Sequence, residues 1–284
     1  MVHTVRSVPV GTATGTADDL RARTARLRLF CFHHAGGSPW SFAGWGRRLG
    51  LDVEVVPVTL PPRSASATPG AVSTMDALVR EVTRQLTPSL AEPYAFYGHS
   101  MGALVAHGVA QRQVAQGRRA PDRLVVGAHR APHLPPALHL NVGLSDRAVL
   151  ELLLGLGGAG RLLRENPRRM RAVTSRLRED LRVSATYRHP AGHRPLPSPI
   201  HVLFGTHDPL VSAEDAAAWR AHTSARFTLR ALPGGHFFQQ DDKELFFTEL
   251  SRVLGTAGTP DSTSVHLDET GLEPFAGLGD PNRQ

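Results

Sequence analysis

A serine between two closely spaced glycines is the feature of this sequence with the clearest chemical potential. The motif GHSMG at residues 98–102 lies between an apolar segment at Tyr94–Gly98 and a helical pattern at Met101–Gly117. In a strand–turn–helix setting, G-x-S-x-G places the serine on a sharp turn where its hydroxyl is exposed. The N-terminus of the following helix favours negative charge that develops beside this hydroxyl. The motif therefore predicts that Ser100 is a nucleophile.

A serine hydroxyl is a weak nucleophile unless a base takes its proton. His236 stands in the segment PGGHFF, after a predicted strand and before the last predicted helix, where a glycine turn can bring an imidazole back to Ser100. Asp208 follows the predicted strand IHVLFG, and its carboxylate would accept the Nδ1–H of that imidazole. Glu214 and Asp215 are rival acids, but they begin a predicted helix, where acidic residues commonly stabilise the helix dipole. We expect Ser100, His236 and Asp208 to form a catalytic triad.

Two backbone N–H groups are candidates for stabilising an oxyanion at Ser100. One belongs to Met101, because the residue after the nucleophile donates in sites of this kind. The other should come from a loop after an early strand, and the segment HHAGGS has the suitable position, with Ala35 as the expected donor. Gly36 and Gly37 let this loop fold back toward the serine.

Predicted strands alternate with predicted helices along most of the chain. The strands are expected at 27–32, 53–58, 94–98, 123–128, 200–205 and 226–232, and the helices at 72–90, 101–117, 213–223 and 242–254. This alternation is typical of an α/β protein with a mainly parallel sheet and helices on both faces.

The elements of this predicted core fall into two stretches, 26–133 and 191–254. Between them, residues 134–190 have a different texture, with closely spaced prolines followed by an arginine-rich helical pattern from Pro167 to about Tyr187, and we interpret them as a helical insertion. Residues 1–25 are expected to form a flexible arm. Residues 255–284, rich in Gly, Thr, Pro and Asp, are expected to be a disordered tail.

The composition is that of an ordinary globular protein. The net charge of +7 could favour an acidic protein partner, but the arginines are dispersed and accompany no nucleic-acid-binding motif. Lys243 is the one lysine among 32 basic residues, which indicates a GC-rich coding sequence. No apolar run reaches the about 18 residues of a membrane span, and the N-terminus lacks the apolar region of a signal peptide. The single cysteine, Cys31, cannot form an intramolecular disulfide and is expected to be a buried strand residue. We therefore expect a cytoplasmic protein.

Several segments together resemble the type II thioesterases, the discrete editing enzymes of polyketide synthases and nonribosomal peptide synthetases. These segments are FCFHHAGGS, YGHSMGA, HRAPHLP, DLRVSATYRH, GTHDPLVS and GGHFF, in that order, and the similarity extends from about Leu27 to Leu254. The resemblance implies an α/β-hydrolase fold in which residues 134–190 form a helical lid.

It also implies hydrolysis of acyl groups held as thioesters on the phosphopantetheine arm of an acyl or peptidyl carrier protein, with no cofactor or metal of the enzyme's own. Ser100, Asp208 and His236 match the family's triad, while Ala35 and Met101 match its oxyanion donors.

The sequence departs from the family pattern at two loops. The pair His33-His34 precedes AGG where the family usually has one histidine or Pro-His, and Pro62 replaces the glycine of a loop of the type LPGRExR. These departures permit a specialised member that releases a full-length product instead of editing. Two other functions stay open: another serine hydrolase, such as an esterase or a product-releasing cyclase, and a non-catalytic hydrolase-like binding protein. Thioester substrates compared with p-nitrophenyl esters would separate a carrier-protein thioesterase from another serine hydrolase. The arginines in 161–182 could contact a carrier protein, although a solvated helix face is the favoured interpretation.

Overall fold

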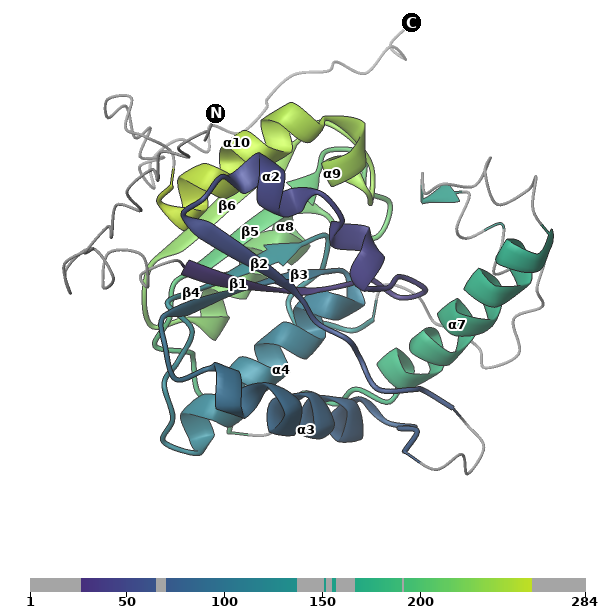
Figure 1. Cartoon of the computed structure of the whole chain (residues 1–284), viewed down its shortest axis with the longest axis horizontal. Coiled ribbons are helices and arrows are strands. Elements are labelled where there is room, and N and C mark those ends of the chain that lie inside the picture. Colours follow the sequence, from purple (N-terminus) through teal and green to yellow (C-terminus); the bar gives the residue numbers. More distant parts are fainter. Residues whose placement is uncertain are drawn as a thin grey trace, which may run out of the picture.

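Six parallel strands form one central sheet in the computed structural model, which describes residues 27–64, 70–136, 151, 155–156, 167–190 and 192–256. The strands are β1 (Leu27–Phe32), β2 (Val53–Pro57), β3 (Tyr94–His99), β4 (Arg123–Gly127), β5 (Ile200–Gly205) and β6 (Phe227–Leu232). Their order in the sheet is β2-β1-β3-β4-β5-β6 (Figure 1), and every neighbouring pair is parallel. All six predicted strands are present, with boundaries that differ by at most one residue.

Helices cover both faces of this sheet (Figure 1). The α-helices are α2 (Trp45–Leu49), α3 (Met75–Leu86), α4 (Met101–Ala115), α7 (Pro167–Ala185), α8 (Ala213–Ala217), α9 (Phe238–Asp241) and α10 (Lys243–Leu254). The 3-10 helices are η1 (Pro39–Phe42), η2 (Thr87–Ser89) and η3 (Ala218–His222). None of the helices among these described residues combines the length and the apolar character needed to span a membrane.

Some helix boundaries differ from the prediction for local physical reasons. The helix expected from residue 72 begins at Met75, because the side chain of Thr74 accepts a hydrogen bond from the N–H of Ala77 and caps the helix there. The helix expected at 213–223 changes after Ala217 into the tighter turn of η3, as helix C-termini often do. The expected GGHFF loop contains the start of α9 at Phe238.

The domain boundaries predicted from the sequence stay predictions, because much of their evidence lies outside the described residues. The arm 1–25 lies wholly outside them, and so does the tail beyond residue 256. In the predicted insertion, the described part is 134–136, 151, 155–156 and 167–190, and it contains α7 where a helix was expected. Figure 1 shows α7 standing at one side of the sheet, in contact with the core through its C-terminal half.

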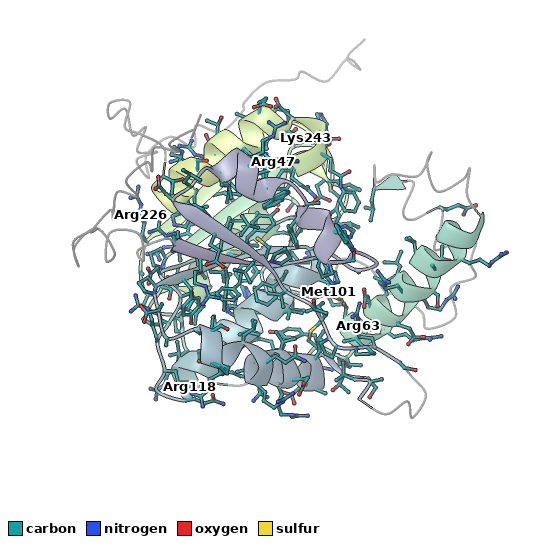
Figure 2. The ribbon with its side chains drawn as sticks, in the orientation of Figure 1. Arg47, Arg63, Met101, Arg118, Arg226 and Lys243 are labelled. Carbon is teal, nitrogen blue, oxygen red and sulfur yellow. The ribbon has the colours of Figure 1, made fainter. Side chains whose placement is uncertain are left out.

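Basic side chains are spread over the core rather than gathered on one face. Figure 2 shows Arg47 on α2, Arg118 after α4 and Arg226 before β6 in three separate regions of the molecule. Many of the arginines are paired with carboxylates, as in the bonds of Arg112 and Arg80 to Asp76. This arrangement supports the interpretation of the arginine bias as dispersed surface charge.

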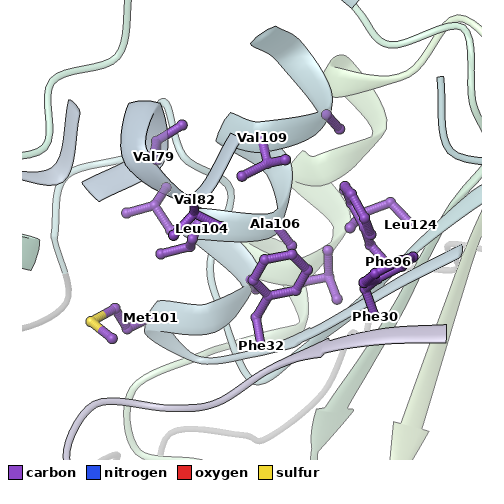
Figure 3. Packing of buried hydrophobic residues seen from close by; sticks show 14 of the residues in the cluster. Phe30, Phe32, Val79, Val82, Phe96, Met101, Leu104, Ala106, Val109 and Leu124 are labelled. Carbon is purple, nitrogen blue, oxygen red and sulfur yellow. The ribbon is translucent and has the colours of Figure 1, made fainter. Parts of the chain in front are cut away.

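The alternation of side chains along β1 separates two hydrophobic clusters, one on each face of the sheet. Phe30 and Phe32 pack with α3 and α4 on one face, together with Phe96 of β3 (Figure 3). Leu29 and Cys31 face the other cluster, which includes α2, α9 and α10. Cys31 is fully buried, as expected, and burial raises the pKa of its thiol well above the usual value.

The turn between β3 and α4 holds Ser100 in an unusual backbone conformation, with φ 52° and ψ −123°. The backbone segments on either side of this turn come very close together. A Cβ on Gly98 would lie 2.4 Å from the carbonyl oxygen of Gly102, and a Cβ on Gly102 would lie 2.1 Å from that of Phe32. The two glycines of the motif are therefore required by packing.

We expect Gly102→Ala to lower the free energy of unfolding by about 1–3 kcal/mol, because the new methyl group must displace backbone atoms of β1. Gly46→Ala is the matched control, since nothing lies within 4 Å of the added Cβ in α2 and alanine favours a helix. Denaturant unfolding of both variants measures the difference. Equal stability of the two variants would contradict this account of the turn.

Candidate active site

The three residues predicted as a triad meet at the carboxyl end of the sheet. Ser100 follows β3, Asp208 follows β5 and His236 follows β6. The Nε2 atom of His236 lies 3.0 Å from Ser100 Oγ, and its Nδ1 lies 2.8 Å from Asp208 Oδ2. The carboxylate can only accept, so Nδ1–H donates to Asp208 and Nε2 is left to accept the hydroxyl proton. The side chains of Asp208 and His236 are 0% and 4% exposed, so water competes little for these bonds.

The loops that carry the acid and the imidazole are fastened to each other. The N–H of Thr206 donates to the carbonyl of Leu232, and the N–H of His207 donates to that of Gly234. Within its own loop, Asp208 accepts a second hydrogen bond from the N–H of Leu210 at 2.9 Å. The carboxylate is therefore held in place from both sides before any substrate arrives.

The rival acids have other partners. Asp215 accepts the hydrogen bond of Arg130 and forms a capping box with Ser212 at the start of α8. Glu214 lies in the first turn of the same helix and is exposed. Of the three acids considered from the sequence, Asp208 is the one that contacts His236.

The two expected oxyanion donors lie beside the serine. Met101 is the first residue of α4, so its N–H has no partner within the helix. The N–H of Ala35 donates to no acceptor among the described residues, and Ala35 lines the same pocket as Ser100 and Met101. The placement fits an oxyanion hole, although the role of these two groups stays a prediction.

A second histidine, His99, positions the loop of His236. Its Nε2 lies 2.9 Å from the carbonyl oxygen of His236, which can only accept, so Nε2 carries the proton. Its Nδ1 then accepts from the hydroxyl of Tyr97 at 3.1 Å. Burial holds the pKa of His99 well below its usual value, so the ring is neutral at pH 7 and keeps this pattern of hydrogen bonds. No role was predicted for His99 from the sequence.

A pocket of about 630 Å³ opens beside the triad. The segment from Ala128 to Pro136 after β4 forms one wall, and the C-terminal part of α7 contributes Leu181, Ser184 and Ala185. Leu104 of α4 adds to the apolar surface near the serine. A ligand with an apolar part and its reactive end at Ser100 fits a pocket with such a lining.

A buried ion pair that sequence reasoning did not identify joins α7 to the candidate oxyanion loop. Asp180 of α7 is completely buried and pairs with Arg63, whose side chain is 9% exposed. The Oδ2 atom of Asp180 also accepts the N–H of Gly36 at 2.8 Å. Figure 2 shows Arg63 and Met101 on the side of the core that faces α7. One carboxylate therefore orders the residue next to Ala35.

The sequence contained an indication that Asp180 is buried. Its helical spacing from Leu177 and Val183 places it on the buried face of α7. A charged residue on an apolar helix face is unusual unless it is paired. The identity of the partner could not be read, since Arg63 lies 117 residues away in the chain.

Comparison with known proteins finds relatives in sequence and in structure. The family model described as a thioesterase domain matches residues 27–254. Thioesterase PikA5 of Streptomyces venezuelae is 33% identical over 257 residues, which cover 90% of this chain and 91% of PikA5.

Two solved structures extend the likeness to the fold. The RedJ thioesterase from the prodiginine pathway of Streptomyces coelicolor aligns with a TM-score of 0.73 and 35% identity, over 87% of this chain and 91% of RedJ. YbtT, a type II thioesterase from the yersiniabactin pathway, aligns with a TM-score of 0.68 and 29% identity, over 80% of this chain and 92% of YbtT.

We expect Asp180→Asn to slow the reaction of Ser100 with a fluorophosphonate by at least about tenfold, compared with roughly 10²–10³ for outright loss of an oxyanion donor. The substitution removes the charge opposite Arg63 and weakens the hold on Gly36, so the neighbouring N–H is less well aimed. The rate of labelling, followed by mass spectrometry, is the measurement.

Glu179→Gln is the matched control for this prediction. It removes the same charge one position earlier, where the carboxylate pairs with Arg182 of the same helix. We expect this variant to be labelled at the wild-type rate. A wild-type rate for Asp180→Asn as well would show that the ion pair does not order the loop.

Proposed function

This chain belongs to the thioesterase family and is a hydrolase that acts on thioesters, and we propose that its substrates are acyl groups on the phosphopantetheine arm of an acyl or peptidyl carrier protein. Relatives from polyketide and nonribosomal peptide pathways support a type II thioesterase role. The observation that carries the proposed chemistry is the continuous hydrogen bonding from Asp208 through His236 to Ser100 at the wall of an open pocket.

Acylation begins when His236 takes the proton of Ser100 and Oγ attacks the thioester carbonyl carbon. The carbonyl electron pair moves onto oxygen, where the N–H groups of Ala35 and Met101 stabilise the negative charge. Asp208 stabilises the imidazolium that forms. When the tetrahedral intermediate collapses, the C–S bond breaks, the sulfur receives the proton from His236, and the acyl group stays on Ser100 as an ester.

Deacylation repeats these steps with water as the nucleophile. His236 takes a proton from water as the oxygen attacks the acyl ester, and the same N–H groups hold the second oxyanion. Collapse breaks the bond to Ser100 Oγ, which regains its proton from His236. The products are the free acid and the carrier protein with its thiol.

The surroundings of the triad support a substrate delivered on a long charged arm. The pocket is apolar near Leu104 and Leu181, which suits an acyl chain. Arg188 is exposed at the pocket, and among the described residues its guanidinium donates hydrogen bonds only to the carbonyl oxygens of Ala185 and Tyr187. This cation is therefore available to a phosphate group. The net charge of +7 favours encounter with an acidic carrier protein.

The test of the proposed substrate is intact-mass analysis of acylated carrier proteins incubated with the enzyme. We expect the wild-type protein to return the carrier to its free-thiol mass, and Ser100→Ala to leave the acyl carrier intact. Acyl-N-acetylcysteamine thioesters and p-nitrophenyl esters should be assayed beside it. Rapid cleavage of oxygen esters with no action on acyl carriers would contradict the proposal, and a cyclised product would point to product release.

The assignment of the acid is tested by Asp208→Asn, which we expect to lower kcat by roughly 10³–10⁴-fold, because an amide cannot hold the imidazole in the tautomer that accepts the serine proton. Asp215→Asn is the control, and we expect it to change kcat by less than about threefold, since its partners lie at the start of α8. Steady-state hydrolysis of a soluble thioester measures both. A larger loss in the Asp215 variant would reverse the assignment.

A further inference from the structure

Five histidine rings gather beside the pocket, at a point where four segments of the chain meet. His107 belongs to α4, His133 to the segment after β4, and His222 to the end of η3, while His189 and His193 lie in the connection from α7 to β5. The centroid of the His222 ring lies between 4.9 and 5.4 Å from those of the other four. The triad contains none of these residues.

Three of these histidines have the spacing of a metal site. His107, His193 and His222 each offer a ring nitrogen, and these three atoms all lie within 4.8 Å of one another. Tetrahedral zinc with Zn–N bonds of about 2.0–2.1 Å requires ligand nitrogens roughly 3.4 Å apart, so these nitrogens would move closer together on binding the ion. Two buried ring nitrogens, Nε2 of His193 and Nδ1 of His222, have no hydrogen-bond partner among the described residues.

The hydrogen bonds of the cluster indicate which ring nitrogens carry a lone pair that could bind a metal ion. His222 Nε2 lies 2.7 Å from His133 Nδ1, so if Nε2–H is the donor, Nδ1 of His222 is the free ligand atom. A partner that accepts the other ring N–H is the usual outer support of a metal-binding histidine. The amide nitrogen of Gln111 approaches Nε2 of His107 at 3.4 Å, and since this group is a donor, it faces a lone pair there.

His107 and His222 are buried, and His193 is partly buried. Trp219 packs edge-on against His107 and closes one side of the cluster. The unpartnered nitrogens of His193 and His222 have lost their water, which costs free energy when nothing binds in its place.

We propose that His107, His193 and His222 bind one Zn²⁺ ion, with a position left open for a water molecule or a fourth side chain. Imidazole nitrogens suit zinc, and a three-histidine set commonly leaves one position open. This proposal departs from the sequence-based expectation that the protein holds no metal. No metal-binding role was predicted for His107, which lies within the helix expected at 101–117.

The bound ion would fasten the segment that follows α7 to the core. His193 is the one ligand on that segment, while His107 and His222 belong to α4 and η3. A protein hydrogen bond already marks the same junction, where Gln111 of α4 donates to the carbonyl of Arg194 at 3.1 Å. Because the C-terminal part of α7 lines the pocket, the ion would stabilise one wall of the substrate site.

The test uses the full-length protein without an affinity tag, stripped with a chelator and then titrated with Zn²⁺ or Co²⁺. We expect about one equivalent of zinc per chain, together with the visible absorption of tetrahedral Co²⁺ and a rise in Tm on metal addition. His193→Gln should weaken zinc binding by more than the roughly 10–100-fold that loss of an outer partner costs.

His201→Gln is the matched control, because His201 lies on β5 and its Nδ1 is paired with Thr228, away from the cluster. We expect it to bind zinc like the wild type. His222→Gln is a second ligand variant, and circular dichroism establishes that each variant folds. A wild-type chain that takes up no zinc, or a folded His193→Gln chain with unchanged zinc affinity, would overturn the proposal. These readouts are independent of thioester hydrolysis, so their failure would leave the proposed function untouched.

Discussion

Two loops that leave neighbouring parallel strands must touch backbone to backbone, and the geometry of the active site depends on this contact. A Cβ on Gly205, the last residue of β5, would lie 2.1 Å from the carbonyl oxygen of Gly235. Since no side chain intervenes, the loops after β5 and β6 share backbone hydrogen bonds. Asp208 and His236 consequently approach within 2.8 Å, in a place from which water is excluded. The hydroxyl of Ser100 meets an imidazole that is already oriented, so little reorganisation accompanies the reaction.

The features that sequence patterns predicted well are those with local determinants. Buried parallel strands appear as short apolar runs, which is why Ile200–Gly205 and the other strands were located within one residue. The residues of the triad could be proposed because each follows a strand, and parallel strands bring their carboxyl ends to one edge. Short elements such as α2 and η1 were missed, since five or fewer residues carry too little periodicity to identify a helix.

Contacts between distant segments could not be predicted in this way. Arg63 and Asp180 are 117 positions apart, and no local pattern pairs them. The histidine cluster is a stronger case, because its members come from four segments that only the folded chain brings together. His107 in particular looks like an ordinary residue of an apolar helix until its neighbours in space are known. The sequence indicated which side chains could take part in chemistry, but it did not indicate which of them lie close together in the fold.

The carboxylate of Asp180 connects the helix that lines the pocket with the loop that contains Ala35. It belongs to α7 and accepts hydrogen bonds from the N–H of Gly36 and from Arg63. A displacement of α7 that carries Asp180 away from the core would break these bonds. An acyl group that holds α7 in its present position would therefore also help to hold the N–H of Ala35 in place. An acyl group too short to touch the helix gains no such benefit, so the enzyme would discriminate among acyl groups by turnover as well as by affinity.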